Sequence, residues 1–202
     1  MLELALLGAG AILLLSARTV HMLIAYVVLA ATVSFFVAPS AFGSPLSLSL
    51  FIVAVVLKVV VAPIGVLAFV RANPEAGDLR PSLAAPLRLV LALVFALVSR
   101  AGAALPVLSA TPLHDLLGFV VLCGIGVLIV HRNLLAHVIG LLVLGAGVTL
   151  VGAVLAPTLP ESVELGATFD ALVVTFIGLA LVRAFFAHKS VLDVEALRNL
   201  RG

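Results

Sequence analysis

The amino-acid sequence predicts an all-α integral membrane protein with seven transmembrane helices, on the basis of its composition, its apolar runs and its charge distribution. Of its 202 residues, 64% are hydrophobic and only 10% are charged, and the mean hydropathy is +1.41. Soluble domains carry roughly a quarter charged residues, so this chain suits lipid better than water. We therefore expect a multi-pass protein of the cell inner (cytoplasmic) membrane, in contact with the lipid bilayer.

The apolar runs set the number of predicted spans, because a helix needs roughly 17 to 25 apolar residues to cross a bilayer. Breaks rich in Pro, Gly, Asn and charge, such as "APSAFGSPL" and "APTLPESVE", separate the runs. Arg18 follows the first run and no basic region precedes it, so we expect a retained span rather than a cleaved signal peptide. The predicted spans are residues 1–17, 20–38, 46–70, 84–105, 112–130, 133–156 and 163–186.

Basic residues orient the predicted bundle. The connections around residues 39–45, 106–111 and 157–162 contain no Lys or Arg. By the positive-inside rule, this separation predicts an N-terminus outside and a C-terminus in the cytoplasm. The basic residues fall in the alternate connections and in the tail: Arg18, Arg71, Arg80, Arg88, Arg132, Lys189, Arg198 and Arg201.

The chain divides into a seven-helix transmembrane domain, residues 1–188, and an amphipathic cytoplasmic tail, residues 189–202. Regularly spaced apolar residues in "HKSVLDVEALRNLRG" suit docking on a partner subunit. Small residues form a face on each of the spans at 112–130 and 133–156, which predicts close helix packing. These small residues are Gly118, Gly124 and Gly126 in the first, and Gly145, Gly147, Thr149 and Gly152 in the second.

Lys58 lies near the middle of the span at 46–70, where an unpaired charge is costly. Five residues later, Pro63 removes a backbone donor and leaves the carbonyl of Val59 without its helical partner. A protonatable amine beside a loosened helical turn is typical of a proton relay. Pairing of Lys58 with a carboxylate of a neighbouring subunit explains its position equally well.

Asp170 interrupts an apolar run about two turns into the last span, and Arg100 lies in the outer third of the span at 84–105. The two side chains either pair as an interhelical contact or leave Asp170 as a proton station. His137, one turn into the span at 133–156, suits a hydrogen-bonded interfacial histidine, with modulation of an ion path as the alternative. His114 and Asp115 open the fifth span, where a carboxylate complements the helix N-terminus.

The sequence excludes several other functions. It has no cluster of basic residues that would bind nucleic acid, and no zinc, iron-sulfur, P-loop or HExxH spacing. No two of its five histidines share a depth suited to bis-histidine haem ligation. Cys123 has no CxxC partner and is expected to be a packing residue. We therefore expect no catalytic residue, cofactor or metal in this chain.

Three stretches in the C-terminal part carry a family resemblance: "HRNLLAHVIGLL" at residues 131–142, "ESVELGATFDALVVTFIGLALV" at 161–182 and the closing "SVLDVEALRNLRG". They resemble component E, a membrane subunit of hydrogenase-4 and formate hydrogenlyase type complexes. From about residue 112 the chain is also similar to the small K-type subunit of respiratory complex I. The resemblance to component E extends over the whole chain in hydropathy and span number, and is specific mainly in residues 131–202 and around "LKVVVAPI", residues 57–64.

On the pattern of component E, Lys58 matches an intramembrane lysine and Asp170 matches an aspartate. The sequence departs from both families where component E has Glu-Asn-Gly, near Gly145, and where K-type subunits have a glutamate, near Leu142. A second K-type glutamate would fall near Val174, and Asp170, one turn earlier on the same face, could replace it. The first glutamate has no substitute in its helix.

The resemblance implies a non-catalytic membrane-arm subunit of a complex I-like, energy-converting oxidoreductase complex that moves protons or sodium ions. Its expected partners are antiporter-like membrane subunits and cytoplasmic redox subunits, and any nickel-iron or iron-sulfur centres would lie in those partners. The proposed ion path uses Lys58 and Asp170, with Arg100 and His137 as charge modulators. Two alternatives are a subunit of a multisubunit cation/proton antiporter without a redox module and a purely structural adaptor.

Overall fold

The computed structural model describes residues 2–38, 45–79, 81–102, 114–155, 169–170 and 173–184, most of which are helical. Each apolar run of the sequence contains a helix, so the all-α prediction is confirmed for these residues. The third run is one long rod in which α3 and α4 join through a π-helical turn, η2. The helices are α1 (Leu2–Leu15), α2 (Thr19–Val37), α3 (Pro45–Val56), η2 (Leu57–Val61), α4 (Ala62–Ala72), the short 3-10 helix η3 (Pro74–Gly77), α5 (Ala85–Gly102), α6 (His114–Val130), α7 (Leu134–Leu155) and a terminal helix, Val173–Ala184.

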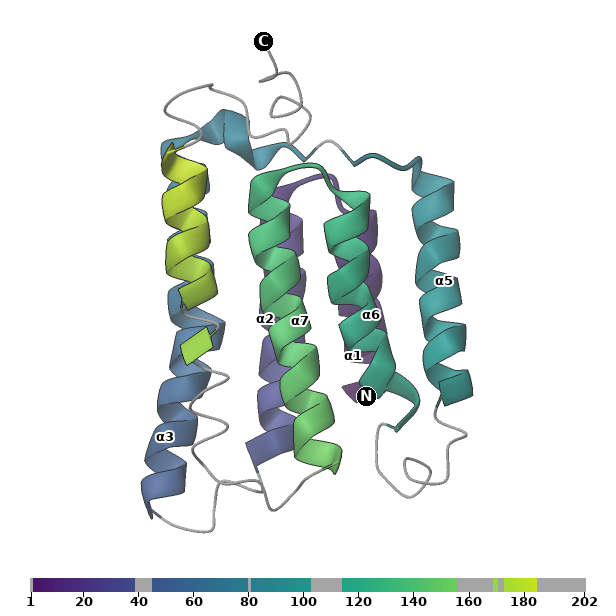
Figure 1. Ribbon diagram of the computed structural model, residues 1–202, viewed down its shortest axis with the longest axis vertical. Helices are drawn as coiled ribbons and strands as arrows, with labels where there is room; N and C mark the ends of the chain where they lie inside the picture. The colour runs from purple at the N-terminus through teal and green to yellow at the C-terminus, as the bar shows by residue number, and fades with distance from the viewer. Residues whose placement is uncertain are drawn as a thin grey trace.

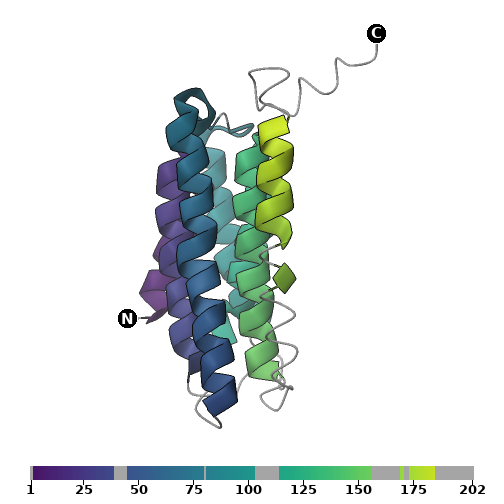
Figure 2. The ribbon, with the colours of Figure 1, turned by 90° about the vertical axis from the view of Figure 1, so that its left-hand side faces the viewer.

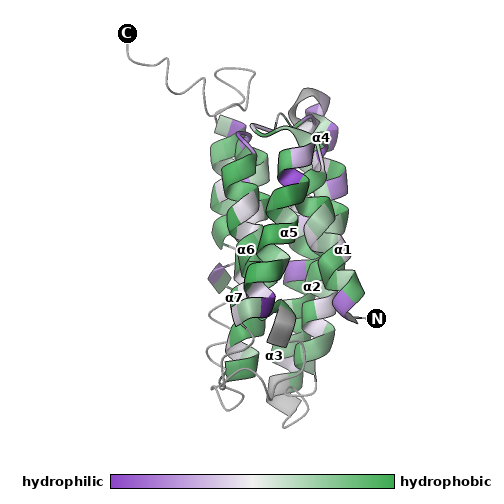
Figure 3. Ribbon diagram, turned by 90° about the vertical axis from the view of Figure 1, so that its right-hand side faces the viewer, coloured by the Kyte–Doolittle hydropathy of each residue, from purple (hydrophilic) through white to green (hydrophobic). Residues whose placement is uncertain are grey.

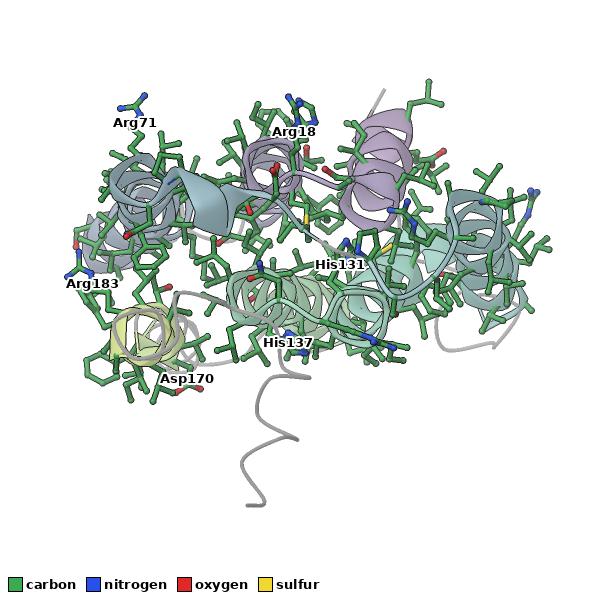
Figure 4. The ribbon with its side chains drawn as sticks, turned by 90° about the horizontal axis from the view of Figure 1, so that it is seen from above. Arg18, Arg71, His131, His137, Asp170 and Arg183 are labelled. Atoms are coloured by element: carbon green, nitrogen blue, oxygen red, sulfur yellow. The ribbon has the colours of Figure 1, made fainter. Side chains whose placement is uncertain are left out.

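The helices form two rows that pack face to face (Figures 1 and 4). One row contains the α3–α4 rod, α2 and α1, and the other contains the terminal helix, α7, α6 and α5. The central contacts are α6 with α7, α1 with α2, and α2 with α7, whereas α5 packs on α6 and α1 at one edge. At the opposite edge, the terminal helix lies beside the α3–α4 rod and α7 (Figure 2).

Apolar residues run along the helices and also cover the outside of the bundle (Figure 3). On α5, for example, Leu93 is 57% and Leu97 is 68% exposed. Such a surface is stable in hydrocarbon and unfavourable in water. Among the described residues, four segments are long and apolar enough to cross a membrane: Thr19–Val37, Leu48–Ala72, Ala85–Gly102 and Leu134–Leu155. Three further apolar helices are shorter. The seven-span count and the orientation of the termini therefore stay predictions.

Three connections meet at one end of the bundle, which we call the loop end. The N–H of Leu79 donates to the carbonyl of Ala17 at 2.9 Å, and the N–H of Ser82 donates to the carbonyl of Val130 at 2.7 Å. The connections that follow α1, α4 and α6 thus lie together, with Arg18, Arg71 and Arg132 in or beside them. The alternating charge pattern requires this arrangement in an up-and-down bundle. At the far end, α2 ends at Val37 and α3 begins at Pro45. α6 begins at His114, which is where the sequence places the start of the fifth span, and the capping role expected for Asp115 stays a prediction. The tail at 189–202 lies outside the described residues.

The close packing predicted for glycines is confirmed at the contact between α6 and α7. A Cβ atom on Gly124 would lie 2.8 Å from the backbone nitrogen of Leu144, and one on Gly147 would lie 2.9 Å from that of Val121. The backbones of the two helices therefore touch. Gly145 and Gly152 make no such contact among the described residues, where a Cβ atom at either position would meet nothing within 4 Å.

Substitution of Gly147 by alanine should destabilise the bundle, since its Cβ atom would collide with the backbone of α6 rather than with a flexible side chain. We expect a loss of about 1–3 kcal/mol, as for other overpacked sites, measured as thermal or denaturant unfolding in detergent. Gly145→Ala is the matched control in the same helix and should leave stability unchanged or slightly raised. Equal stability of the two variants would contradict the packing described here.

Candidate functional site

The π-helical turn around Lys58 has a local cause in the sequence. The N–H of Ala62 donates to the carbonyl of Leu57, five residues earlier. The carbonyl of Lys58 thus loses its α-helical donor, Ala62, and its π-helical donor would be Pro63, which has no N–H. The hydroxyl of Tyr26 on α2 donates to this carbonyl at 3.1 Å and satisfies it.

The sequence correctly located a break near Pro63 but placed the unpaired carbonyl at Val59. The structure shows the external donor one residue earlier, at Lys58. The difference follows from the π register, which shifts each carbonyl's donor by one position. Tyr26 itself was missed, because nothing in the sequence marks which residue of another helix faces a free carbonyl.

The amine of Lys58 reaches across the bundle to α7. Its Nζ donates to the hydroxyl oxygen of Thr149 at 3.2 Å, and that hydroxyl donates to the carbonyl of Gly145 at 2.9 Å. Lys58 is partly buried. A polar connection therefore runs from the π-helical turn through the hydroxyl of Thr149 to the carbonyl of Gly145 on α7.

A cavity of about 30 Å³ lies beside the amine, between α2, α3 and α7. One water molecule needs roughly 10–15 Å³ of such space and two or more polar partners. Lys58, Thr149 and Ser34 supply polar atoms, so the cavity has the size and chemistry to hold one or two waters. The other lining residues are apolar: Ala30, Val33, Val37, Phe51, Ala54, Val55 and Ala146.

Asp170 and Arg100 do not form the pair that their depths suggested. Arg100 lies in the last turn of α5, at one edge of the bundle, and segment 169–170 lies at the opposite edge (Figures 1 and 4). Of the two alternatives for Asp170, an ion pair with Arg100 within the chain does not fit this arrangement, and the role of Asp170 as a proton station stays a prediction. Similar depth does not make two helices neighbours, and the sequence offered no information on which helices are adjacent. Both side chains are exposed on the outside of the chain.

His137 lies in the first turn of α7 and bonds through Nδ1 to the carbonyl of Asn133 at 2.8 Å. This local contact is what an interfacial, hydrogen-bonded histidine would make. Twelve residues of helix separate His137 from Thr149, a rise of about 18 Å. His137 therefore does not share the site of Lys58, and its role as a modulator of an ion path stays a prediction.

A second polar cluster, at the loop end, was not predicted. Arg88, in the first turn of α5, is only 7% exposed, and its Nη1 donates to the carbonyl of Leu15 at 2.7 Å. His131 is 1% exposed, and its Nε2 lies 3.1 Å from the carbonyl of Ser16. These side chains satisfy the last carbonyls of α1, where a cation also complements the helix dipole. The sequence showed Arg88 only as one of several loop charges.

Burial lowers the pKa of His131, and electrostatic repulsion between its protonated ring and both Arg88 and His137 lowers it further. Hydrogen bonds from the ring to the carbonyls of Ser16 and Val127 act in the opposite direction and do not compensate for burial. His131 is therefore neutral in the folded protein near pH 7, and a neutral ring donates one hydrogen bond. The shorter contact assigns that bond to Nε2 and Ser16.

His131 should make the protein acid-sensitive. Its pKa in the unfolded chain is about 6.5, and the folded value is lower, so below about pH 6.5 the unfolded state takes up a proton that the folded state resists. Thermal stability should therefore fall from about pH 7.5 to about pH 5.5, and less so in His131→Gln, which keeps a donor for Ser16. His21→Gln, which removes an exposed histidine, is the control. Equal acid sensitivity of the parent and His131→Gln would contradict this assignment.

The long apolar helices and the apolar outer surface define the class of a multi-pass membrane protein. Within it, residues 112–202, just under half of the chain, match the family model described as NADH-ubiquinone/plastoquinone oxidoreductase chain 4L. The match includes α6, α7 and the terminal helix but not Lys58. No curated protein and no solved structure is significantly similar to the chain. Within the described part of the chain, no group of His, Cys, Asp or Glu side chains could hold a metal ion.

Proposed function

We propose that this chain is a membrane-arm subunit of a complex I-like, energy-converting redox complex of the hydrogenase-4 or formate hydrogenlyase type. It would contribute to ion translocation that is coupled to electron transfer in other subunits. The match of residues 112–202 to chain 4L of an oxidoreductase is the observation that carries the proposal. Nickel-iron and iron-sulfur centres would lie in cytoplasmic partner subunits, and this chain would have no catalytic centre.

Lys58 is the residue best suited to an ion-path role. Its amine lies beside a cavity that fits water, and it contacts a hydroxyl on α7, within the region similar to chain 4L. The π-helical turn supports the same role, because irregular backbone inside a membrane is tolerated where it lines a cavity or meets a neighbouring helix. A purely structural lysine would not need a cavity that fits water beside its amine.

The position of Asp170 supports a larger assembly. Segment 169–170 lies about halfway along the bundle (Figure 1), and Asp170 points away from it (Figure 4). A carboxylate that faced lipid at this depth would be costly, so a neighbouring subunit or water must cover it. The terminal helix would then contribute Asp170 to a path or contact completed by another chain.

Two alternatives rest on specific observations. A multisubunit cation/proton antiporter would use the Lys58 cavity in the same way without a redox module. A purely structural adaptor agrees with the absence of an acid at Leu142 and Gly145, since a complete chain of carboxylates cannot pass through this subunit alone.

Co-purification in mild detergent, followed by mass spectrometry, tests the proposed assembly. We expect antiporter-like membrane subunits together with a nickel-iron subunit and iron-sulfur subunits. Recovery of antiporter subunits alone would favour the antiporter, and recovery of the chain by itself would count against every multisubunit reading.

Lys58→Met should leave the complex assembled and reduce turnover-coupled proton or sodium movement in proteoliposomes by at least about tenfold, since methionine keeps the length of the side chain and removes its exchangeable proton. Native gels report assembly separately from transport. Arg18→Met, at an exposed loop residue, is the control and should transport normally. Normal transport by an assembled Lys58→Met variant would remove Lys58 from the path, and loss of assembly would identify it as a structural residue.

A further inference from the structure

The cavity beside Lys58 extends along the bundle in one direction from the amine. On α2 its lining residues extend from Ala30 to Val37, the last residue of that helix. On α3 they lie between Phe51 and Lys58, again on the far-end side of the amine. The empty space therefore extends from Lys58 toward the far end, where α2 ends and α3 begins.

Toward the loop end, tightly packed side chains close the same position. Tyr26, one turn before Ala30 on α2, is 1% exposed, and its hydroxyl is bonded to the carbonyl of Lys58. Beyond it, Met22 and Val66 are completely buried. The hydrogen bond that satisfies the π-helical turn thus also fixes the side chain that closes the path on this side.

We propose that Lys58 has one-sided aqueous access, from the far end of the bundle only, and that this path takes water and protons rather than sodium ions. The proposal rests on the proposed function in that the chain spans a membrane, and it adds the side and the ion. The described residues that line the cavity include no carboxylate. A sodium ion needs several oxygen ligands, whereas here an amine faces the space and would repel a cation.

In chemical terms, an amine at the blind end of a water-filled path exchanges protons with one compartment. Lys58 accepts a proton from water of the cavity and returns it to the same side, as long as Tyr26 closes the other side. Net translocation then requires a second arrangement in which the contact between Tyr26 and Lys58 opens. The structure has the Tyr26–Lys58 hydrogen bond formed, which corresponds to the arrangement closed toward the loop end.

Cysteine accessibility tests the proposed access. Cys123 is buried, and its replacement by serine gives a background for single cysteines in the full-length chain. Ser34→Cys, in the cavity, should react with silver ion, a membrane-impermeant thiol reagent small enough for a space that holds one or two waters, from one side of oriented membrane vesicles and at least about tenfold more slowly from the other. Ala54→Cys, on α3, is a second probe of the same cavity in case the first variant does not fold.

Two further variants calibrate the measurement. Ala17→Cys, exposed at the loop end, identifies the vesicle orientation that presents that end, and the cavity probes should react in the opposite orientation. Thr32→Cys lies two residues from Ser34 and is only 8% exposed, so it should react slowly in both. Reaction of folded Ser34→Cys and Ala54→Cys from the side of Ala17→Cys, from both sides or from neither would overturn the proposal. The readout requires only the inserted chain, so it can fail or succeed independently of the co-purification that tests the assembly.

The ion is tested separately. In the purified complex in proteoliposomes, turnover-driven acidification or alkalinisation should persist when sodium is replaced by choline. Loss of more than about nine-tenths of the ion movement in choline, with labelling unchanged, would overturn the assignment to protons and leave the access side in place.

Discussion

A backbone carbonyl inside a hydrocarbon layer must find a donor within the protein, and the carbonyl of Lys58 finds it on another helix. The π-helical turn diverts its α-helical donor, the N–H of Ala62, to the carbonyl of Leu57, and the next residue, Pro63, has no N–H. The hydroxyl of Tyr26 donates to the carbonyl of Lys58 instead, at 3.1 Å. This one interaction joins α2 to the π-helical turn. The side chain of Lys58 contacts Thr149 on α7 and lines the cavity, so one residue connects the turn, α2, α7 and the cavity.

Backbone polar groups at the two ends of the bundle are also satisfied by contacts between different helices. At the loop end, Arg88 and His131 satisfy the last carbonyls of α1, and backbone hydrogen bonds join three connections that are distant in sequence. Near the far end, the hydroxyl of Ser99 accepts a hydrogen bond from the N–H of Phe119 at 2.9 Å and fastens α5 to α6. α5 is thus held to the bundle by a polar contact near each of its ends, with apolar packing between them.

The sequence predicted the helices well because hydropathy and helix length are properties of single segments. It placed all seven apolar runs, the break at Pro63 and the close contact at Gly124 and Gly147. It failed where the answer depended on neighbours: Arg100 and Asp170 lie at opposite edges, and Gly145 faces open space. Tyr26 and Arg88 were missed for the same reason, since a tyrosine and a loop arginine acquire their roles only from the carbonyls that other helices bring to them.

The touching backbones of α6 and α7 have a mechanical consequence. At Gly124 and Gly147 the backbones of α6 and α7 are in direct contact, with no side chain between them. Close-packed atoms resist compression, so we expect these two helices to move together as one rigid unit in the middle of the subunit. The α3–α4 rod beside it is more compliant, because its π-helical turn can return to α-helical register by a shift of one residue. If a neighbouring subunit displaced the α3–α4 rod, we would therefore expect the change in helical register to occur at the π-helical turn around Lys58. Thr149, on the rigid pair of α6 and α7, would stay in place.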